Sequence, residues 1–205
     1  MGLYGRYVLP RITDLAMRNK APRLERARYV PLAAGVVLEV GAGSALNLPF
    51  YGEGVERLVA LEPSRELWSL GRARVHAARF PVDFVPASAE AIPAPDRSFD
   101  SAVMTWTLCT VADPGAALAE IARVLKPAGR LIFIEHGKAP DAGVAAWQDR
   151  LNPLWRPLAG GCNMNREIAS LVAASGLVVD ELETGYAAGP RVLSYLYKGV
   201  ATRRR

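Results

Sequence analysis

The residues best suited to chemistry in this sequence form a glycine-containing turn directly after a strand of apolar residues. Glu39 precedes the turn, Gly41, Ala42 and Gly43 form it, and Asn47 comes after it. Glycine has no Cβ, so the backbone can bend sharply there and come close to a ligand. A glycine pair after a strand is also a common simple turn, and Glu39 could be only a half-buried strand residue, so the interpretation depends on the residues after the turn.

A second carboxylate further along the chain favours a nucleotide-binding interpretation. Residues 57–61 have the pattern of another apolar strand, and Glu62 and Pro63 come directly after it. A strand, a glycine turn, a helix, a second strand and an acid about 20 residues after the turn are typical of the nucleotide-binding half of a doubly wound sheet. In that arrangement we expect Glu62 to accept hydrogen bonds from two ribose hydroxyls.

The charge and composition of the turn indicate which nucleotide it would bind. A dinucleotide site needs a third glycine and a helix N-terminus aimed at a pyrophosphate, and Leu46 stands at the third glycine position. The carboxylate of Glu39 would also repel a pyrophosphate. It suits S-adenosylmethionine, which carries an ammonium group and a cationic sulfur.

These residues resemble the first motif of the class I S-adenosylmethionine-dependent methyltransferases, of the small single-domain type related to the quinone-biosynthesis and alkyl-thiol methyltransferases. That motif ends in G-x-G-x-G, and Ala45 stands here at the third glycine, so we expect the turn to tolerate a Cβ. The resemblance implies that S-adenosylmethionine is the cofactor. It also implies that Ser88, Ala89 and Glu90 lie at the adenine, where the family more often has Asp in place of Ser88. Thr105, at the end of the fourth expected strand, is assigned to the cofactor site as well.

The rest of the sequence supplies the elements that must position these residues. Apolar runs alternate with helical patterns, which indicates an α/β fold whose parallel sheet is covered on both faces. We predict strands over residues 36–40, 57–61, 82–85, 101–105, 131–134, 178–182 and 192–198, and helices beginning after Ser64, Asp113 and Asn165. The resemblance implies a Rossmann-like, doubly wound, seven-stranded mixed sheet, mostly parallel with an antiparallel last strand, in a single domain over residues 1–205.

Two segments are expected to cover the site. Residues 1–30 have the pattern of an N-terminal helical cap, and residues 137–165 that of an irregular insert over the acceptor site. Acceptor residues should lie in these segments and at the carboxyl ends of the strands. On that basis we assign to the acceptor site Tyr4, Tyr7, Trp106, Cys109, Trp147 and Cys162. Each of them has a simpler alternative role, in core packing or in an ordinary surface contact.

His136 is the candidate catalytic residue, because an imidazole titrates near neutral pH and could take a proton from the acceptor. Its alternative role is to satisfy a backbone group at the sheet edge. A thiol, with a pKa of about 8.5, ionises easily, whereas an aliphatic amine must first lose a proton. The segments 108–111, 134–136 and 161–167 resemble parts of the alkyl-thiol methyltransferases.

The leading hypothesis is therefore methyl transfer from S-adenosylmethionine to a small-molecule acceptor, with a thiol as the first choice. One alternative is N-methylation of a phospholipid headgroup or another amine, and a second is modification of RNA. A third is a cofactor-binding module without catalytic activity.

Composition and cysteine content indicate the class of protein and its cellular location. The chain has 205 residues, of which 51% are hydrophobic and 22% charged, as in a globular protein. Cys109 and Cys162 lie far apart in the sequence, with His76 and His136 as the only histidines, so we expect no disulfide framework, no metal site and a reducing, cytoplasmic location.

The net charge of +5 raises the question of an anionic partner. The arginines are scattered except for the terminal run 203–205, which disfavours nucleic acid and leaves peripheral contact with a membrane open. No window has the length of apolar sequence that a membrane-spanning helix needs. The oligomeric state stays open.

Overall fold

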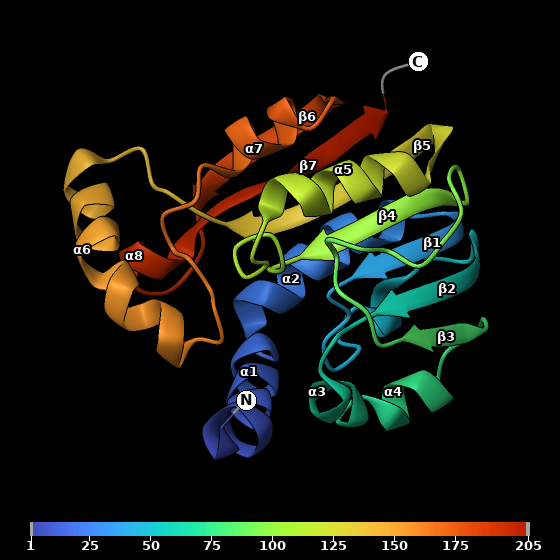
Figure 1. Ribbon diagram of the computed structural model, residues 1–205, viewed down its shortest axis with the longest axis horizontal. Coiled ribbons are helices and arrows are strands. Elements are labelled where there is room, and N and C mark those ends of the chain that lie inside the picture. Colours follow the sequence, from blue (N-terminus) through green and yellow to red (C-terminus); the bar gives the residue numbers. More distant parts are fainter. Residues whose placement is uncertain (1, 204–205) are drawn as a thin grey trace.

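The computed structural model describes residues 2–203; Met1, Arg204 and Arg205 lie outside the described residues, and with them most of the predicted basic tail. Within residues 2–203, seven strands form one sheet in the order β3-β2-β1-β4-β5-β7-β6 (Figure 1). The strands are β1 (Gly35–Val40), β2 (Val55–Leu61), β3 (Val82–Val85), β4 (Phe99–Thr105), β5 (Leu125–His136), β6 (Leu177–Tyr186) and β7 (Tyr195–Arg203). Strands β1 to β5 pair in parallel, and β7 runs antiparallel to both of its neighbours. The predicted mixed sheet with an antiparallel last strand is confirmed.

Helices cover both faces of this sheet (Figure 1). They are η1 (Tyr4–Val8), α1 (Leu9–Met17), α2 (Lys20–Tyr29), η2 (Val30–Leu32), η3 (Leu48–Phe50), α3 (Arg65–Ser69), α4 (Arg72–His76), α5 (Pro114–Val124), α6 (Ala142–Leu158), α7 (Ile168–Ala174) and α8 (Arg191–Ser194). Side chains alternate along β1, so Leu38 packs with α5 and α7 while Val37 packs with Tyr29 on the opposite face. The sheet therefore has a hydrophobic core on each face, and the same strands supply side chains to both cores.

Two predicted helix starts are confirmed by their capping side chains. The Ser64 hydroxyl accepts a hydrogen bond from the Leu67 N–H at 3.1 Å, and the Asp113 carboxylate accepts one from the Ala116 N–H at 3.0 Å. The helix expected after Ser64 is nevertheless broken into α3 and α4 at Gly71. A Cβ at Gly71 would lie 2.6 Å from the Ser44 carbonyl oxygen, so the break lets the chain pass close to the glycine turn.

The structure corrects three other expectations. The segment 137–165 is not an irregular run, because it contains the 17-residue helix α6 with Pro153 and Pro157 inside it. Proline disfavours a helix interior, but packing of α6 against α8 and the hydrogen bond from the Met164 N–H to Asn152 outweigh that preference. The third helix begins at Ile168 rather than after Asn165, and α8 takes up the first residues of the predicted last strand.

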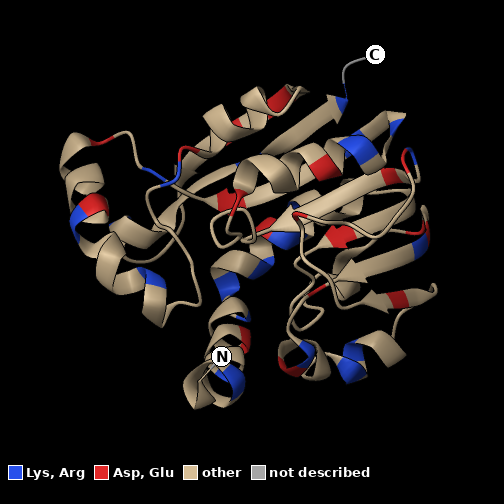
Figure 2. Cartoon of the chain, viewed as in Figure 1, with Lys and Arg blue, Asp and Glu red and all other residues tan. Residues whose placement is uncertain are grey.

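Charged residues of both signs are spread over most elements, and this view shows no single basic patch (Figure 2). None of the helices within residues 2–203 combines the length and the hydropathy that crossing a bilayer requires.

Candidate active site

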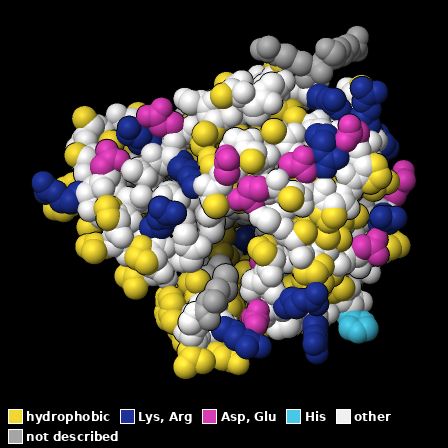
Figure 3. Space-filling view, in the orientation of Figure 1, with side chains coloured by type: hydrophobic (Ala, Val, Ile, Leu, Met, Phe, Trp, Pro, Cys, Tyr) yellow, Lys and Arg dark blue, Asp and Glu magenta, His cyan; other side chains and the backbone are white. Residues whose placement is uncertain are grey.

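The carboxyl ends of β1, β2, β4 and β5 meet at one edge of the sheet, beside the N-terminal helices, and the surface is hollowed there (Figures 1 and 3). The glycine turn leaves β1 at this edge. Gly41 has a φ of 70° and Gly43 one of 56°, values that favour glycine. Ala45 has a φ of 59° with its methyl group buried, so the turn does accommodate a Cβ at that position, as expected.

Gly41 is the tightest point of the turn. A Cβ built there would lie 2.2 Å from Thr107 Oγ1 and 2.5 Å from Thr107 Cγ2. Thr107 has little freedom to move, because its Oγ1 lies 3.1 Å from the carbonyl oxygens of both Val40 and Thr105. The ends of β1 and β4 are thus locked together around a position that only glycine fits.

Glu62 joins the end of β2 to the turn. Its Oε2 accepts the Gly43 N–H at 2.9 Å and its Oε1 accepts the Ser64 N–H at 2.8 Å. Burial raises the pKa of Glu62, and these two backbone donors partly oppose that rise. Each carboxylate oxygen keeps a further lone pair, so the side chain fits a ligand with two adjacent hydroxyls, as on a ribose.

Glu39 lies beneath the turn in a buried polar cluster. Its carboxylate accepts hydrogen bonds at 2.9 Å from both Asn47 Nδ2 and Tyr51 Oη, and Asn47 Nδ2 lies 3.0 Å from Thr105 Oγ1. Burial raises the pKa of Glu39 to about 7, although the bonds from Tyr51 and Asn47 oppose it. Arg26 Nε donates to Asn47 Oδ1 at 2.8 Å. The cluster can therefore present either a neutral or a negative surface to a cationic ligand.

The N-terminal helices are fastened to this turn. Asp14 of α1 accepts a hydrogen bond from the Ser44 hydroxyl at 2.6 Å, and the Arg26 guanidinium of α2 lies 4.9 Å from the Trp106 ring centroid. The sequence-based assignment missed both Asp14 and Arg26. The available signal was that Asp14 is the only acid in the basic stretch before Glu25.

The segment assigned to the adenine comes after β3 at the same edge. Ser88 is exposed, and its hydroxyl donates to the Glu90 carboxylate, while Ala89 is buried. Glu90 Oε1 also accepts the backbone N–H groups of Ala112 and Asp113, at 2.9 and 3.3 Å. Glu90 therefore ties this segment to the start of α5, while the Ser88 oxygen can still accept a bond from an amino group. Pro63 is exposed beside Glu62.

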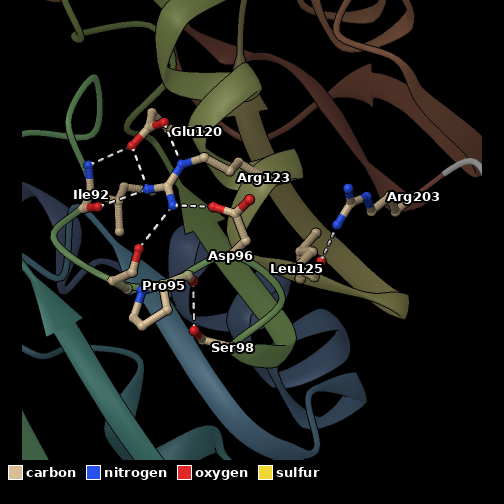
Figure 4. A network of polar contacts seen from close by, with 9 residues as sticks. Ile92, Pro95, Asp96, Ser98, Glu120, Arg123, Leu125 and Arg203 are labelled. Carbon is tan, nitrogen blue, oxygen red and sulfur yellow. Dashed lines mark hydrogen bonds and ion pairs between the residues drawn. The ribbon is translucent and has the colours of Figure 1, made fainter.

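Arg123 of α5 fixes the continuation of this segment (Figure 4). Its guanidinium donates to Glu120 Oε1 at 2.7 Å, to the carbonyls of Ile92 and Ala94 at 2.9 Å each, and to Asp96 at 2.8 Å. Glu120 Oε2 in turn accepts the Ile92 N–H at 2.9 Å. A single side chain thus holds the connection between β3 and β4 against α5.

Replacing Arg123 with methionine is expected to lower the free energy of unfolding by about 2 kcal/mol, because a hydrogen bond to a charged group is worth ~1.5–3 kcal/mol and the bonds here are not additive. Affinity for S-adenosylmethionine should fall a few fold, since the adenine segment loses its support. Urea denaturation and calorimetric titration measure the two effects. Arg130→Met, at an exposed arginine of β5, is the matched control; equal behaviour of the two variants would refute the role given to Arg123.

Glu135 organises the segment after β4. It is fully buried at the end of β5, and its carboxylate accepts the backbone N–H groups of Thr107 at 2.8 Å and Cys109 at 3.3 Å. Burial raises the pKa of Glu135 to about 7, against the effect of these backbone donors. The Trp106 N–H donates to the Ile134 carbonyl at 2.7 Å. The backbone after β4 is therefore fixed by the buried side chain of Glu135.

His136 and both cysteines lie together at this edge. His136 Nε2 is 2.9 Å from Cys162 Sγ, and the two sulfurs are 3.7 Å apart. Burial lowers the pKa of His136, but its contact with Cys162 and the charge of Glu135 raise it more, so the net shift is upward. Its Nδ1 is buried and has no hydrogen-bond partner among residues 2–203. We expected no metal site because Cys109 and Cys162 lie far apart in the sequence. The fold brings their side chains together, so that argument no longer holds.

Three residues assigned to the acceptor site are exposed to solvent. Tyr4, Tyr7 and Trp147 are 42%, 49% and 53% exposed. The Tyr4 hydroxyl donates to the Leu158 carbonyl of α6 at 2.8 Å, and Arg150 lies over the Trp147 ring. Their assignment to the acceptor stays a prediction.

A doubly wound sheet with a glycine turn after β1 and an acid after β2 is the arrangement typical of Rossmann-like, nucleotide-binding folds. Residues 38–133 match the family model described as "Methyltransferase domain". A thiol S-methyltransferase of Rattus norvegicus is 32% identical over 135 residues, which cover 64% of this chain and 55% of the relative. A phosphatidylethanolamine N-methyltransferase of Cereibacter sphaeroides is 30% identical over 131 residues, which cover 62% of this chain and 64% of the relative.

The fold has close counterparts among solved structures. A chain of the complex that contains the Haloferax volcanii Trm112 methyltransferase activator superposes with a TM-score of 0.74, at 19% identity and with 98% of each chain covered. The present chain spans only a little over half the length of the thiol S-methyltransferase that it matches. Residues 38–133 match a methyltransferase domain and the relatives named above are methyltransferases, in agreement with the predicted protein class. A solved structure of an S-adenosylmethionine-dependent methyltransferase from Thermotoga maritima shares the fold, in agreement with the predicted cofactor, and the predicted fold is confirmed.

Proposed function

We propose that this protein transfers the methyl group of S-adenosylmethionine to the sulfur of a small-molecule thiol. The observation that carries the proposal is the cluster of Cys109, His136 and Cys162 near the carboxyl ends of β4 and β5. The glycine turn is close by, because Thr107, two residues before Cys109, packs against Gly41. Sulfur and imidazole form a polarisable surface that suits a thiol better than a phosphorylated headgroup. The thiol S-methyltransferase relative supports the same acceptor.

The cofactor would lie against the glycine turn. Glu62 would hold the two ribose hydroxyls, because it is the carboxylate with free lone pairs at the end of β2. Glu39, acting with Asn47 and Thr105, would face the cationic methionine end. The assigned remainder of the cofactor site is Gly41, Ala42, Gly43, Pro63, Ser88, Ala89 and Glu90. When bound, S-adenosylmethionine supplies an electrophilic methyl group on a sulfonium.

Methyl transfer is an in-line displacement, so the protein has to align the thiol sulfur with the methyl carbon and keep water out. The new sulfur–carbon bond forms as the sulfonium–methyl bond breaks, and the thiol proton leaves before or during this step. His136 is a buried imidazole at the carboxyl end of β5. His136 would promote loss of the thiol proton, either by accepting the proton itself or by holding another group that promotes its loss.

The test is an acceptor screen with methyl-labelled S-adenosylmethionine, in which small alkyl thiols are compared with amines, phenols and vesicles of phosphatidylethanolamine. We expect labelled thioethers from the thiols, and loss of about 100-fold or more of the rate at pH 7 in His136→Gln, a typical range for a group that assists proton transfer. His76→Gln is the matched control, because His76 is exposed on α4. Turnover of the vesicles with no turnover of any thiol would establish the N-methyltransferase alternative, which the Cereibacter sphaeroides relative favours.

A further inference from the structure

Three side chains of the kinds that bind metal ions lie together near the carboxyl ends of β4 and β5. The sulfurs of Cys109 and Cys162 and an imidazole nitrogen of His136 all lie within 4.8 Å of one another. The two sulfurs are 3.7 Å apart, and Nε2 is 2.9 Å from Cys162 Sγ. All three groups can bind the same borderline-soft cation, because zinc prefers thiolate sulfur and imidazole nitrogen.

The three donors come from separate parts of the chain that the fold holds rigidly together. His136 ends β5, with its backbone paired to Leu196 of β7. Cys109 comes after β4, and its carbonyl accepts both the backbone N–H of Asn163, at 2.8 Å, and the Asn163 side-chain amide, at 3.0 Å. Since Asn163 is the next residue after Cys162, these bonds fix one cysteine against the other.

A second contact holds the same two segments together. Arg166 donates to the carbonyls of Leu108 and Val111, on either side of Cys109. The backbone on which both sulfurs stand is therefore fixed independently of the sulfurs themselves. Ligands that are fixed in advance by their surroundings are the usual condition for a specific metal site.

We propose that Cys109, His136 and Cys162 form a zinc-binding site with a fourth coordination position open to the acceptor. In a tetrahedral site with Zn–S bonds of about 2.3 Å, two sulfurs lie about 3.8 Å apart, close to the separation found here. The His136–Cys162 distance would have to open by roughly half an ångström, since a nitrogen and a sulfur on one zinc lie about 3.5 Å apart. Three protein ligands with one free position are typical of catalytic zinc, whereas structural sites have four.

The open position has a specific use in the reaction, and this part rests on the proposed function. An acceptor thiol that binds the metal gives up its proton to solvent and is held as a thiolate. Its sulfur then forms the bond to the methyl carbon as the sulfonium–methyl bond breaks. His136 would in that case serve as a metal ligand, and the metal rather than the imidazole would promote loss of the thiol proton.

The experiment uses the full chain, purified with a non-thiol reductant and freed of metal with a chelator, and titrated with Co²⁺. One equivalent should produce the intense visible absorption of tetrahedral cobalt together with a thiolate-to-cobalt charge-transfer band, and added Zn²⁺ should remove both. Cys109→Ser and Cys162→Ser should each weaken binding by about 100-fold or more, since even the loss of an outer-shell partner costs ~10–100-fold. His136→Ala should do the same, with His76→Ala as the control that leaves the spectrum unchanged.

Octahedral cobalt, binding without a thiolate band, or an unchanged spectrum in Cys162→Ser would overturn the site. Should the serine variants fail to fold, X-ray absorption of the zinc-loaded wild type decides, because the proposal requires two sulfurs and one imidazole on the metal. Failures of the two proposals are distinguishable. Metal binding without turnover of any thiol refutes the proposed function alone, and thiol turnover by a protein that binds no metal refutes the zinc site alone.

Discussion

Gly41→Ala is expected to weaken S-adenosylmethionine binding by more than about 100-fold, since a displacement of about 1 Å in a positioned site can cost that factor. The added Cβ would lie 2.2 Å from Thr107 Oγ1, and Thr107 is fixed by the carbonyls of Val40 and Thr105. The φ of 70° adds a conformational cost of about 1–2 kcal/mol for any residue with a Cβ. The backbone must therefore shift at the point where the turn would meet the ligand.

The same turn provides the control. Ala45 already has a φ of 59°, so Ala45→Gly relieves a strained conformation while it removes one buried methyl group. These effects oppose each other, and we expect the stability to change by no more than about 1 kcal/mol. Calorimetric titration of both variants with S-adenosylmethionine, together with thermal melts, makes the comparison. Binding by Gly41→Ala at wild-type affinity would show that the ligand does not use this turn.

Glu39→Gln is expected to raise the free energy of unfolding at pH 8 and, at the same pH, to weaken the binding of S-adenosylmethionine. In the ligand-free protein, burial raises the pKa of Glu39 from 4.5 to about 7, so the folded state retains a proton that the unfolded state has already released. The free energy of unfolding should therefore fall as the pH rises from about 4.5 to about 7. At ~1.4 kcal/mol for each unit of pKa, this group accounts for on the order of 3 kcal/mol across that window.

Glutamine keeps the geometry of the cluster without the charge. Its carbonyl can accept from Asn47, and its amide can donate to the Tyr51 oxygen, so the variant should be more stable than the wild type at pH 8. It should also bind S-adenosylmethionine about 10- to 100-fold more weakly at that pH, because a hydrogen bond to a charged group is worth ~1.5–3 kcal/mol. Near pH 5 the two proteins should converge, since Glu39 is then neutral.

Urea denaturation and calorimetry at several pH values between 5 and 8 test both effects. Glu135 also has its pKa raised to about 7 by burial, so a part of the slope of stability against pH should remain in the variant. Parallel pH profiles for the wild type and Glu39→Gln, in stability and in affinity, would contradict the role given to this carboxylate.

The sequence predicted the sheet well because its strands are either continuous apolar runs or lie next to strong turn signals. Capping residues such as Ser64 and Asp113 fixed two helix starts, since a cap acts through bonds only three residues away. Helix α6 was missed because its prolines disfavour a helix locally, whereas contacts with α8 and with residues near Asn163 compensate for them in the fold.

The arrangement of the candidate site could be predicted where its residues belong to one strand and the adjoining turn, and not where they come from several elements. Glu39, Gly41 and Glu62 belong to motifs with a fixed spacing, so the sequence located them. Arg26 and Tyr51 reach the same cluster through tertiary packing, and no local pattern indicates that they do. The approach of Cys109 to Cys162 likewise depends on how two loops dock.

The attachment of the first helices to the glycine turn has a consequence for the extent of the functional unit. The region that matches the family model begins at residue 38, yet Asp14 and Arg26 form part of the wall around the turn and precede that boundary. A fragment cut to the matched region would leave Ser44 and Asn47 without these partners. Chimaeras and domain exchanges among such enzymes should therefore carry the amino-terminal helices together with the sheet they cover.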